Sequence, residues 1–170
     1  FVIVPTGFNF WMIPQKLISN INNVTFQFNG NFSACNLNMS GWPMTPGSSN
    51  KFRLHFIALK DSKDIVFVGN GGVIQGHGYP WWKLEFEPKT FGFHRPNLID
   101  LDSVTHLVMD SVQLFDSPRY HVHCNPCFGV LIQKMNIEVS IFDQYYLLKK
   151  NGKLAHKKFD LPTFPLNTDG

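Results

Sequence analysis

Short runs of alternating apolar and polar residues, separated by turn-forming residues, dominate this sequence. Residues 23–28 alternate before Asn29-Gly30, and residues 64–68 alternate before a Gly-Asn-Gly-Gly turn at 69–72. Alternation with a period of two predicts β-strands with one buried face, and Gly, Asn, Asp and Ser supply the turns. Further strands are expected at residues 98–101, 106–109, 112–115, 129–132 and 135–139.

Two pairs of these strands recur at a fixed spacing. Leu107 and Val130 each lie near the start of a strand that is followed by a second strand, and the two pairs are a little over 20 residues apart. A less regular repeat relates residues 22–26 to residues 63–67, because both segments lead into a Gly/Asn turn and another strand. A period of this length suits one coil of a solenoid.

Three all-β architectures fit a chain of short strands: a sandwich, a barrel and a parallel β-helix. A sandwich would favour two-residue hairpins, and Asn29-Gly30 could supply one. The repeat favours a β-helix, in which each coil stacks on its neighbours and its corners need left-handed residues such as Asn and Gly. Helical patterns are weak, and only residues 143–150 resemble a helix. We therefore expect residues 1–170 to form a single all-β solenoid domain.

Composition limits the classes of protein that this chain can belong to. It has 170 residues, 44% hydrophobic and 16% charged, which is a globular balance, and its net charge of +3 is too small to indicate nucleic-acid binding. No apolar run approaches the roughly 18 residues of a membrane span, and no signal-peptide pattern is present. Residues 1–5 resemble a strand entered midway, so we expect a fragment that is incomplete at both ends.

Three sequons and three cysteines bear on localisation. Asn23, Asn31 and Asn38 each open an Asn-x-Ser/Thr triplet, which makes them possible glycosylation sites and favours an extracellular location. Three cysteines are too few for a disulfide scaffold.

The segment around Cys124 and Cys127 resembles a metal cluster in composition. Strand alternation puts His121 and His123 on one face, which would give two possible ligands. A Cys-x-x-Cys without a second pair is weak support for zinc, and the repeat assigns these positions to an ordinary strand and turn. We expect no metal site.

The last residues, Asn167-Thr168-Asp169-Gly170, would by themselves indicate only a turn. Together with earlier segments they resemble the ordered landmarks of glycoside hydrolase family 28, the polygalacturonase family. The resemblance covers nearly the whole chain. Its landmarks are Val-Ile-Val-Pro-Thr-Gly at 2–7, Asn-Val-Thr at 23–25, Gly-Gly-Val-Ile-Gln-Gly-His-Gly at 71–78 with Trp81-Trp82, Arg-Pro-Asn-Leu-Ile at 95–99, Asp-Ser-Pro-Arg-Tyr-His-Val-His at 116–123 and Asn-Thr-Asp-Gly at 167–170.

The resemblance implies a right-handed parallel β-helix and, for a typical member, hydrolysis of α-1,4 bonds between galacturonates in pectin with inversion. It implies that Asp169 is a catalytic, water-activating carboxylate, and that two adjacent aspartates, a Gly-His and an Arg-x-Lys follow on later coils. An inverting glycosidase needs a protonated carboxyl and a carboxylate far enough apart to admit water. Asn167 could bind sugar, or bond to backbone as a ladder residue at a corner. No cofactor is implied, and we expect a secreted monomer.

This chain departs from the family pattern in several places. It contains no adjacent Asp-Asp pair and no Arg-x-Lys after Asp169, so we expect it to be inactive by itself. Gly76-His77-Gly78 lies too early to be the family's catalytic Gly-His. Residues 140–161 could form a loop lining the cleft or a solvated excursion, and Trp81 and Trp82 could stack on sugar rings or pack a loop onto the coils. A non-catalytic β-helix that binds carbohydrate, or a structural surface protein, is the alternative.

Overall fold

The protein forms two parallel β-sheets in a computed structural model that describes residues 1–14, 16–35, 41–48, 52–86 and 94–140. Sheet A has the strand order β1-β4-β6-β8-β10, with β3 paired to β6, and sheet B has the order β11-β9-β7-β5-β2. The strands of sheet A are β1 (Val2–Val4), β3 (Ile18–Ser19), β4 (Asn22–Phe28), β6 (Ile57–Gly69), β8 (Ile99–Asp110) and β10 (Val122–Gln133). Those of sheet B are β2 (Asn9–Met12), β5 (Asn31–Ala34), β7 (Val73–Gln75), β9 (Gln113–Phe115) and β11 (Asn136–Glu138).

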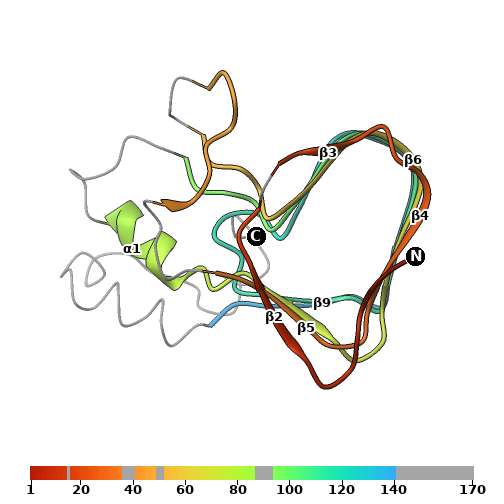
Figure 1. The fold of residues 1–170 in the computed structure, drawn as a ribbon, viewed down its shortest axis with the longest axis horizontal. Helices are drawn as coiled ribbons and strands as arrows, with labels where there is room; N and C mark the ends of the chain where they lie inside the picture. The colour runs from red at the N-terminus through yellow and green to blue at the C-terminus, as the bar shows by residue number, and fades with distance from the viewer. Residues whose placement is uncertain (15, 36–40, 49–51, 87–93, 141–170) are drawn as a thin grey trace, which may run out of the picture.

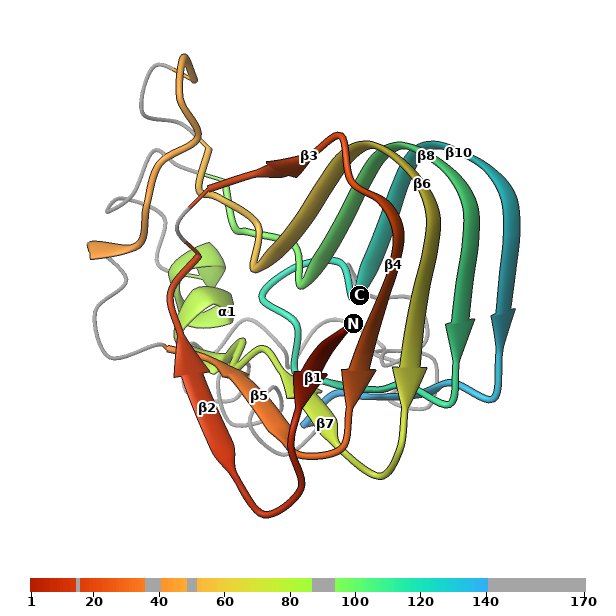
Figure 2. The same ribbon diagram turned by 45° about the vertical axis from the view of Figure 1, so that its right-hand side comes forward.

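Successive coils of the chain lie side by side, which makes the molecule a parallel β-helix (Figure 2). Leu107 pairs with Val130, so the repeat predicted from the sequence is confirmed. The less regular repeat between residues 22–26 and 63–67 is confirmed as well, because Val24 pairs with Ile65 and Phe26 with Phe67. The hairpin alternative is wrong, since β4 and β5 belong to different sheets and residues 29–30 form a corner between them.

The long strands of sheet A bend at residues with left-handed backbone angles. Asn23, Asp64, His106 and Gly129 have φ of 55°, 56°, 54° and 64° and occupy equivalent positions on β4, β6, β8 and β10. A bend of this kind lets one strand curve around two sides of the bore, as Figure 1 shows. Asn, Asp and Gly tolerate this conformation better than other residues do, which explains their recurrence at the corner.

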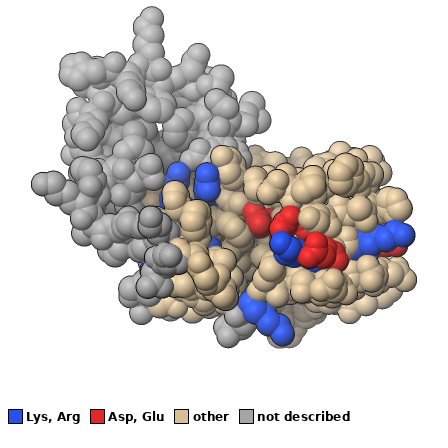
Figure 3. Space-filling model, turned by 90° about the horizontal axis from the view of Figure 1, so that it is seen from above, with Lys and Arg blue, Asp and Glu red and all other residues tan. Residues whose placement is uncertain are grey.

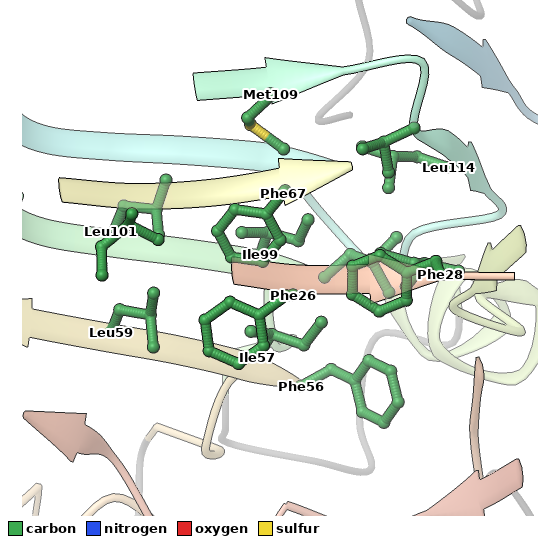
Figure 4. Close-up of a cluster of buried hydrophobic side chains, with 14 of the residues drawn as sticks. Phe26, Phe28, Phe56, Ile57, Leu59, Phe67, Ile99, Leu101, Met109 and Leu114 are labelled. Carbon is green, nitrogen blue, oxygen red and sulfur yellow. The ribbon is translucent and has the colours of Figure 1, made fainter. Parts of the chain in front are cut away.

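Apolar side chains from neighbouring coils stack inside the bore (Figure 4). The rings of Phe26 and Phe67 are stacked, with centroids 5.0 Å apart and planes 15° apart. Ile99, Leu101 and Leu107 on β8 have no exposed surface. Burial of this apolar surface supplies the main driving force for folding.

The helix α1 (Tyr79–Phe86) lies beside the coils, and the sequence did not predict it (Figure 1). Pro80 suits the first turn of a helix, where its missing N–H costs nothing. Trp81 is fully buried and meets Trp42 edge to face, with ring centroids 5.5 Å apart. Packing of the indoles, rather than a periodic apolar stripe, therefore holds this short helix in place.

Across the ranges that the structure describes, no helix is long and apolar enough to cross a membrane. The helix expected at residues 143–150 and the long segment at 140–161 lie, apart from Ser140, outside the described residues.

Candidate functional site

Polar side chains gather on the outer face of sheet A where β6, β8 and β10 begin. Ile99 and Leu101 point into the bore, so the residues that alternate with them, Asp100 and Asp102, face outward. The parallel register aligns Asp100 with His123 on β10, and Asp102 with Lys60 on β6. On the face seen in Figure 3, acidic and basic side chains lie next to one another on an otherwise largely uncharged described surface.

Asp100 is the centre of this cluster. Its Oδ1 lies 2.8 Å from Nδ1 of His123 and accepts a hydrogen bond of 2.7 Å from Nδ2 of Asn97. Its Oδ2 lies 3.7 Å from Nε2 of His55. An ionised carboxylate can only accept hydrogen bonds, so His123 carries a proton on Nδ1 and its Nε2 is left to meet a ligand.

His55 and Asn97 form the inner edge of the cluster. The backbone N–H of Asn97 donates to Nδ1 of His55 at 2.8 Å, which requires that nitrogen to be unprotonated. Burial lowers the pKa of His55, although the nearby Asp100 acts in the opposite direction. Asn97 is only 3% exposed, and its buried Oδ1 has no hydrogen-bond partner among the described residues. His55 is therefore held neutral, and Asn97 retains an unused acceptor.

Tyr120 and Arg119 border the cluster on the side of β10. The Tyr120 ring stacks on His123, with centroids 5.6 Å apart and planes 15° apart. The guanidinium carbon of Arg119 lies 4.7 Å from the centre of the Tyr120 ring, a cation–π contact. The aromatic ring thus supports His123 and keeps a permanent positive charge nearby.

A second pair, Lys60 and Asp102, lies one alternation further along the same strands. Lys60 Nζ is 2.9 Å from Asp102 Oδ2. The hydrogen bond between them lowers the pKa of Asp102 and raises the pKa of Lys60. The two opposite charges of this pair cancel. Within the cluster, His123 and Arg119 are therefore the side chains that can bind a negatively charged ligand.

His121 does not share a face with His123, contrary to the expectation from alternation. It lies just before β10 begins, is 2% exposed, and accepts a hydrogen bond at Nε2 from the backbone N–H of Ser117 at 3.3 Å. Burial lowers the pKa of His121 to about 4. Within the described ranges, no three His, Cys, Asp or Glu side chains converge in a way that could hold a metal ion.

Cys124 and Cys127 take ordinary positions on β10. They pair in register with Leu101 and Val104, two buried core residues, as an ordinary strand requires. The Cys124 side chain is exposed and that of Cys127 is partly buried.

The residues proposed from the sequence for catalysis and sugar binding, Asp169 and Asn167, lie outside the described residues, as does the sequon at Asn38. Asn23 is exposed at a corner of sheet A. Asn31 is also exposed, but its Nδ2 donates to Oδ1 of Asn9 at 2.7 Å.

The aromatic residues near α1 are packed rather than presented to a ligand. Trp81 is fully buried, and Trp82 is 7% exposed and donates through Nε1 to the carbonyl oxygen of Ser117 at 2.9 Å. His77 stacks on Trp11 with ring centroids 4.7 Å apart, at the corner after β7 and away from the starts of the sheet A strands. Of the two readings for Trp81 and Trp82, packing onto the coils is the one that the geometry supports.

The cluster around Asp100 was not identified from the sequence. A signal was present, because Ile99-Asp100-Leu101-Asp102 alternates apolar and acidic residues at the start of a strand. His55 and His123 are 68 positions apart in sequence, and only the coil stacking brings them to the same carboxylate. The assembled groups can bind hydroxyls and a negatively charged ligand through hydrogen bonds and charge.

The amino-acid sequence is similar to those of known glycosidases. The profile of glycosyl hydrolases family 28 matches residues 2–170. A probable polygalacturonase of Vitis vinifera is 31% identical over 74 residues, which is 44% of this chain and 15% of that protein. The chain thus aligns with a small part of the length of this curated relative. No solved structure matched the chain.

Proposed function

The chain belongs to glycosyl hydrolases family 28, and on that premise we propose that the full-length protein hydrolyses α-1,4-galacturonosidic bonds of pectin with inversion. The observation that carries the proposal is the family match over residues 2–170, which includes the Asn-Thr-Asp-Gly motif. The parallel β-helix and the polar cluster around Asp100 support it, because a flat strand face with aligned polar side chains suits an extended sugar polymer.

In this proposal Asp169 acts as a general base. Its carboxylate takes a proton from the water that attacks the anomeric carbon, while a protonated carboxyl elsewhere donates a proton to the leaving glycosidic oxygen. Asn167 hydrogen-bonds the sugar next to the cleaved bond. Neighbouring carboxylates would raise the pKa of the acid through like-charge repulsion.

The chain contains no adjacent aspartate pair and no Arg-x-Lys after Asp169, so we propose that these 170 residues alone do not cleave pectin. The acid catalyst and further substrate-binding groups would then come from coils beyond Gly170 in the full-length protein. Acid–base hydrolysis of this kind uses carboxyl groups and water and calls for no cofactor.

The test is the release of reducing ends from polygalacturonate by the full-length protein and by its Asp169→Asn variant. We expect the variant to lose activity by at least about 100-fold, the range that acid–base groups contribute. Equal rates for the two proteins would remove Asp169 from the mechanism. Binding of polygalacturonate without any release of reducing ends, even by the unmodified protein, would favour a non-catalytic carbohydrate-binding β-helix.

We also place the protein outside the cell, where a pectin-cleaving member of this family would meet its polysaccharide. Asn23 is the better of the two described glycosylation candidates, because the amide of Asn31 already donates to Asn9. Enzymatic removal of N-glycans from secreted protein should increase its gel mobility, and an Asn23→Gln variant should show a smaller shift. An unchanged shift in that variant would exclude a glycan at Asn23.

A further inference from the structure

His123 is the residue of the polar cluster whose side chain is both held in place by its neighbours and open to solvent. Its side chain is 41% exposed, its ring is fixed by Asp100 on one edge and by Tyr120 on one face, and it lies near the start of β10 on the outer side of sheet A. Among the described residues, Nε2 of His123 makes no hydrogen bond. A ring held this firmly, with one polar atom left over, is suited to contact a ligand.

We propose that His123 is a proton-operated anchor for one uronate carboxylate of the polysaccharide. The inference rests on the proposed function, since it concerns the same outer face of sheet A. With Nδ1–H donating to Asp100, a neutral His123 offers only an acceptor at Nε2 and would repel a carboxylate. Protonation turns Nε2 into a charged donor, which attracts a carboxylate and forms a short charge-assisted hydrogen bond with it.

The charges around His123 allow such a switch to operate. Asp100 supplies one negative charge and Arg119 one positive charge near the His123 ring, and Lys60 and Asp102 form their own ion pair at 2.9 Å. The strand β10 carries no Asp, Glu, Lys or Arg. A single proton on His123 therefore changes the local charge balance from near neutral to positive.

His55 does not share this role, although it also faces Asp100. Its Nδ1 accepts the backbone N–H of Asn97 at 2.8 Å, so a second proton on the ring would break that bond. Burial lowers the pKa of His55, which favours a neutral ring.

The test measures binding rather than cleavage. The full-length protein with Asp169→Asn would be titrated calorimetrically with a trimer of galacturonate at pH 5 and pH 7.5, where the sugar carboxylates remain ionised. We expect affinity about 10-fold higher at pH 5, the effect of roughly one partly screened charge pair. The same trimer with esterified carboxyls should show no such difference.

Two variants of His123 make the outcome decisive. His123→Gln should reduce the pH effect to less than about 2-fold, and His123→Lys, with a permanent positive charge, should bind the trimer as tightly at pH 7.5 as at pH 5. The matched control is His106→Gln, because His106 makes a similar histidine–carboxylate contact, 2.9 Å to Asp64, at a corner of sheet A. We expect His106→Gln to keep the full pH effect.

A pH effect that persists in His123→Gln, or that His106→Gln removes equally, would overturn the proposal. An equal effect with the esterified trimer would overturn it too. Hydrolysis by the unmodified protein is measured separately. A failure of the His123 proposal therefore does not refute the proposed hydrolysis, and a protein without hydrolytic activity can still show pH-dependent binding through His123.

Discussion

At the scale of single residues, two adjacent glycines at the corner between β6 and β7 are needed for different reasons. Gly71 has a φ of +85° and open space around the position of a side chain. Gly72 has no such angle, but a Cβ there would collide with the carbonyl oxygen of Gly30 on the neighbouring coil. One position constrains the backbone conformation and the other constrains the distance between coils.

Substitution by alanine should separate these two effects. Gly71→Ala should cost about 1 kcal/mol of unfolding free energy, the penalty of a left-handed alanine. Gly72→Ala should cost about 3 kcal/mol or more, because two backbones must move apart. Urea unfolding followed by circular dichroism measures both, and equal losses would contradict the assignment.

The buried His121 predicts a loss of stability in acid. Its pKa is lowered by burial to about 4 from an ordinary 6.5, so the unfolded chain binds the proton more readily. The free energy of unfolding should therefore be independent of His121 titration above about pH 6.5. As the pH falls from 6.5 towards 4, it should decrease by about 3 kcal/mol in total because of this residue. His121→Leu should flatten this part of the curve of unfolding free energy against pH, whereas the exposed His106→Gln should leave it unchanged.

At the scale of elements, the α1 helix and the loop that carries Trp42 stabilise each other through an aromatic contact. Trp81 is fully buried, and its ring meets Trp42 at an interplanar angle of 84°. Aromatic pairs in this arrangement add to the free energy gained from burial alone. The helix therefore depends on the loops between coils for its position.

Truncation of Trp81 should test this dependence. Trp81→Ala should destabilise the protein by about 3–5 kcal/mol, since it removes a large buried side chain. Trp11, which is 56% exposed, provides the control, and Trp11→Ala should cost less than about 1 kcal/mol. Thermal unfolding of the two variants measures the contrast, and a similar fall in Tm for both would show that Trp81 is not a packing residue.

The elements also show which features the sequence could predict. Strand alternation and the repeat at Leu107 and Val130 correctly predicted the coils, because stacked strands impose the same pattern on each coil. The α1 helix was missed, since tertiary packing of Trp81 and not a periodic pattern sustains it. The cluster around Asp100 was missed because its members are brought together only by coil stacking and by loops that precede the strands.

At the scale of the whole molecule, stability should vary along the stack of coils. β6 and β8 each have strands on both sides, whereas β1 pairs only with β4 among the described strands. In a solenoid each coil is stabilised mainly by its immediate neighbours. The middle of the stack should therefore open least often.

Hydrogen exchange of the 170-residue chain can check this expectation. Amides of β6 and β8 should exchange at least about 10-fold more slowly than those of β1, as read by mass spectrometry of peptic fragments. Uniform protection across these strands would instead indicate that all coils open together.

The coil formed by β10 and β11 repeats the previous coil without insertion or deletion. The offset from β8 to β10 and from β9 to β11 is 23 residues throughout, from Ile99 to Val122 and from Gln113 to Asn136. A duplicated gene segment of that length would add one complete coil and keep every strand in register. Evolution, or a protein engineer, could therefore lengthen the outer face of sheet A one coil at a time without redesigning the core.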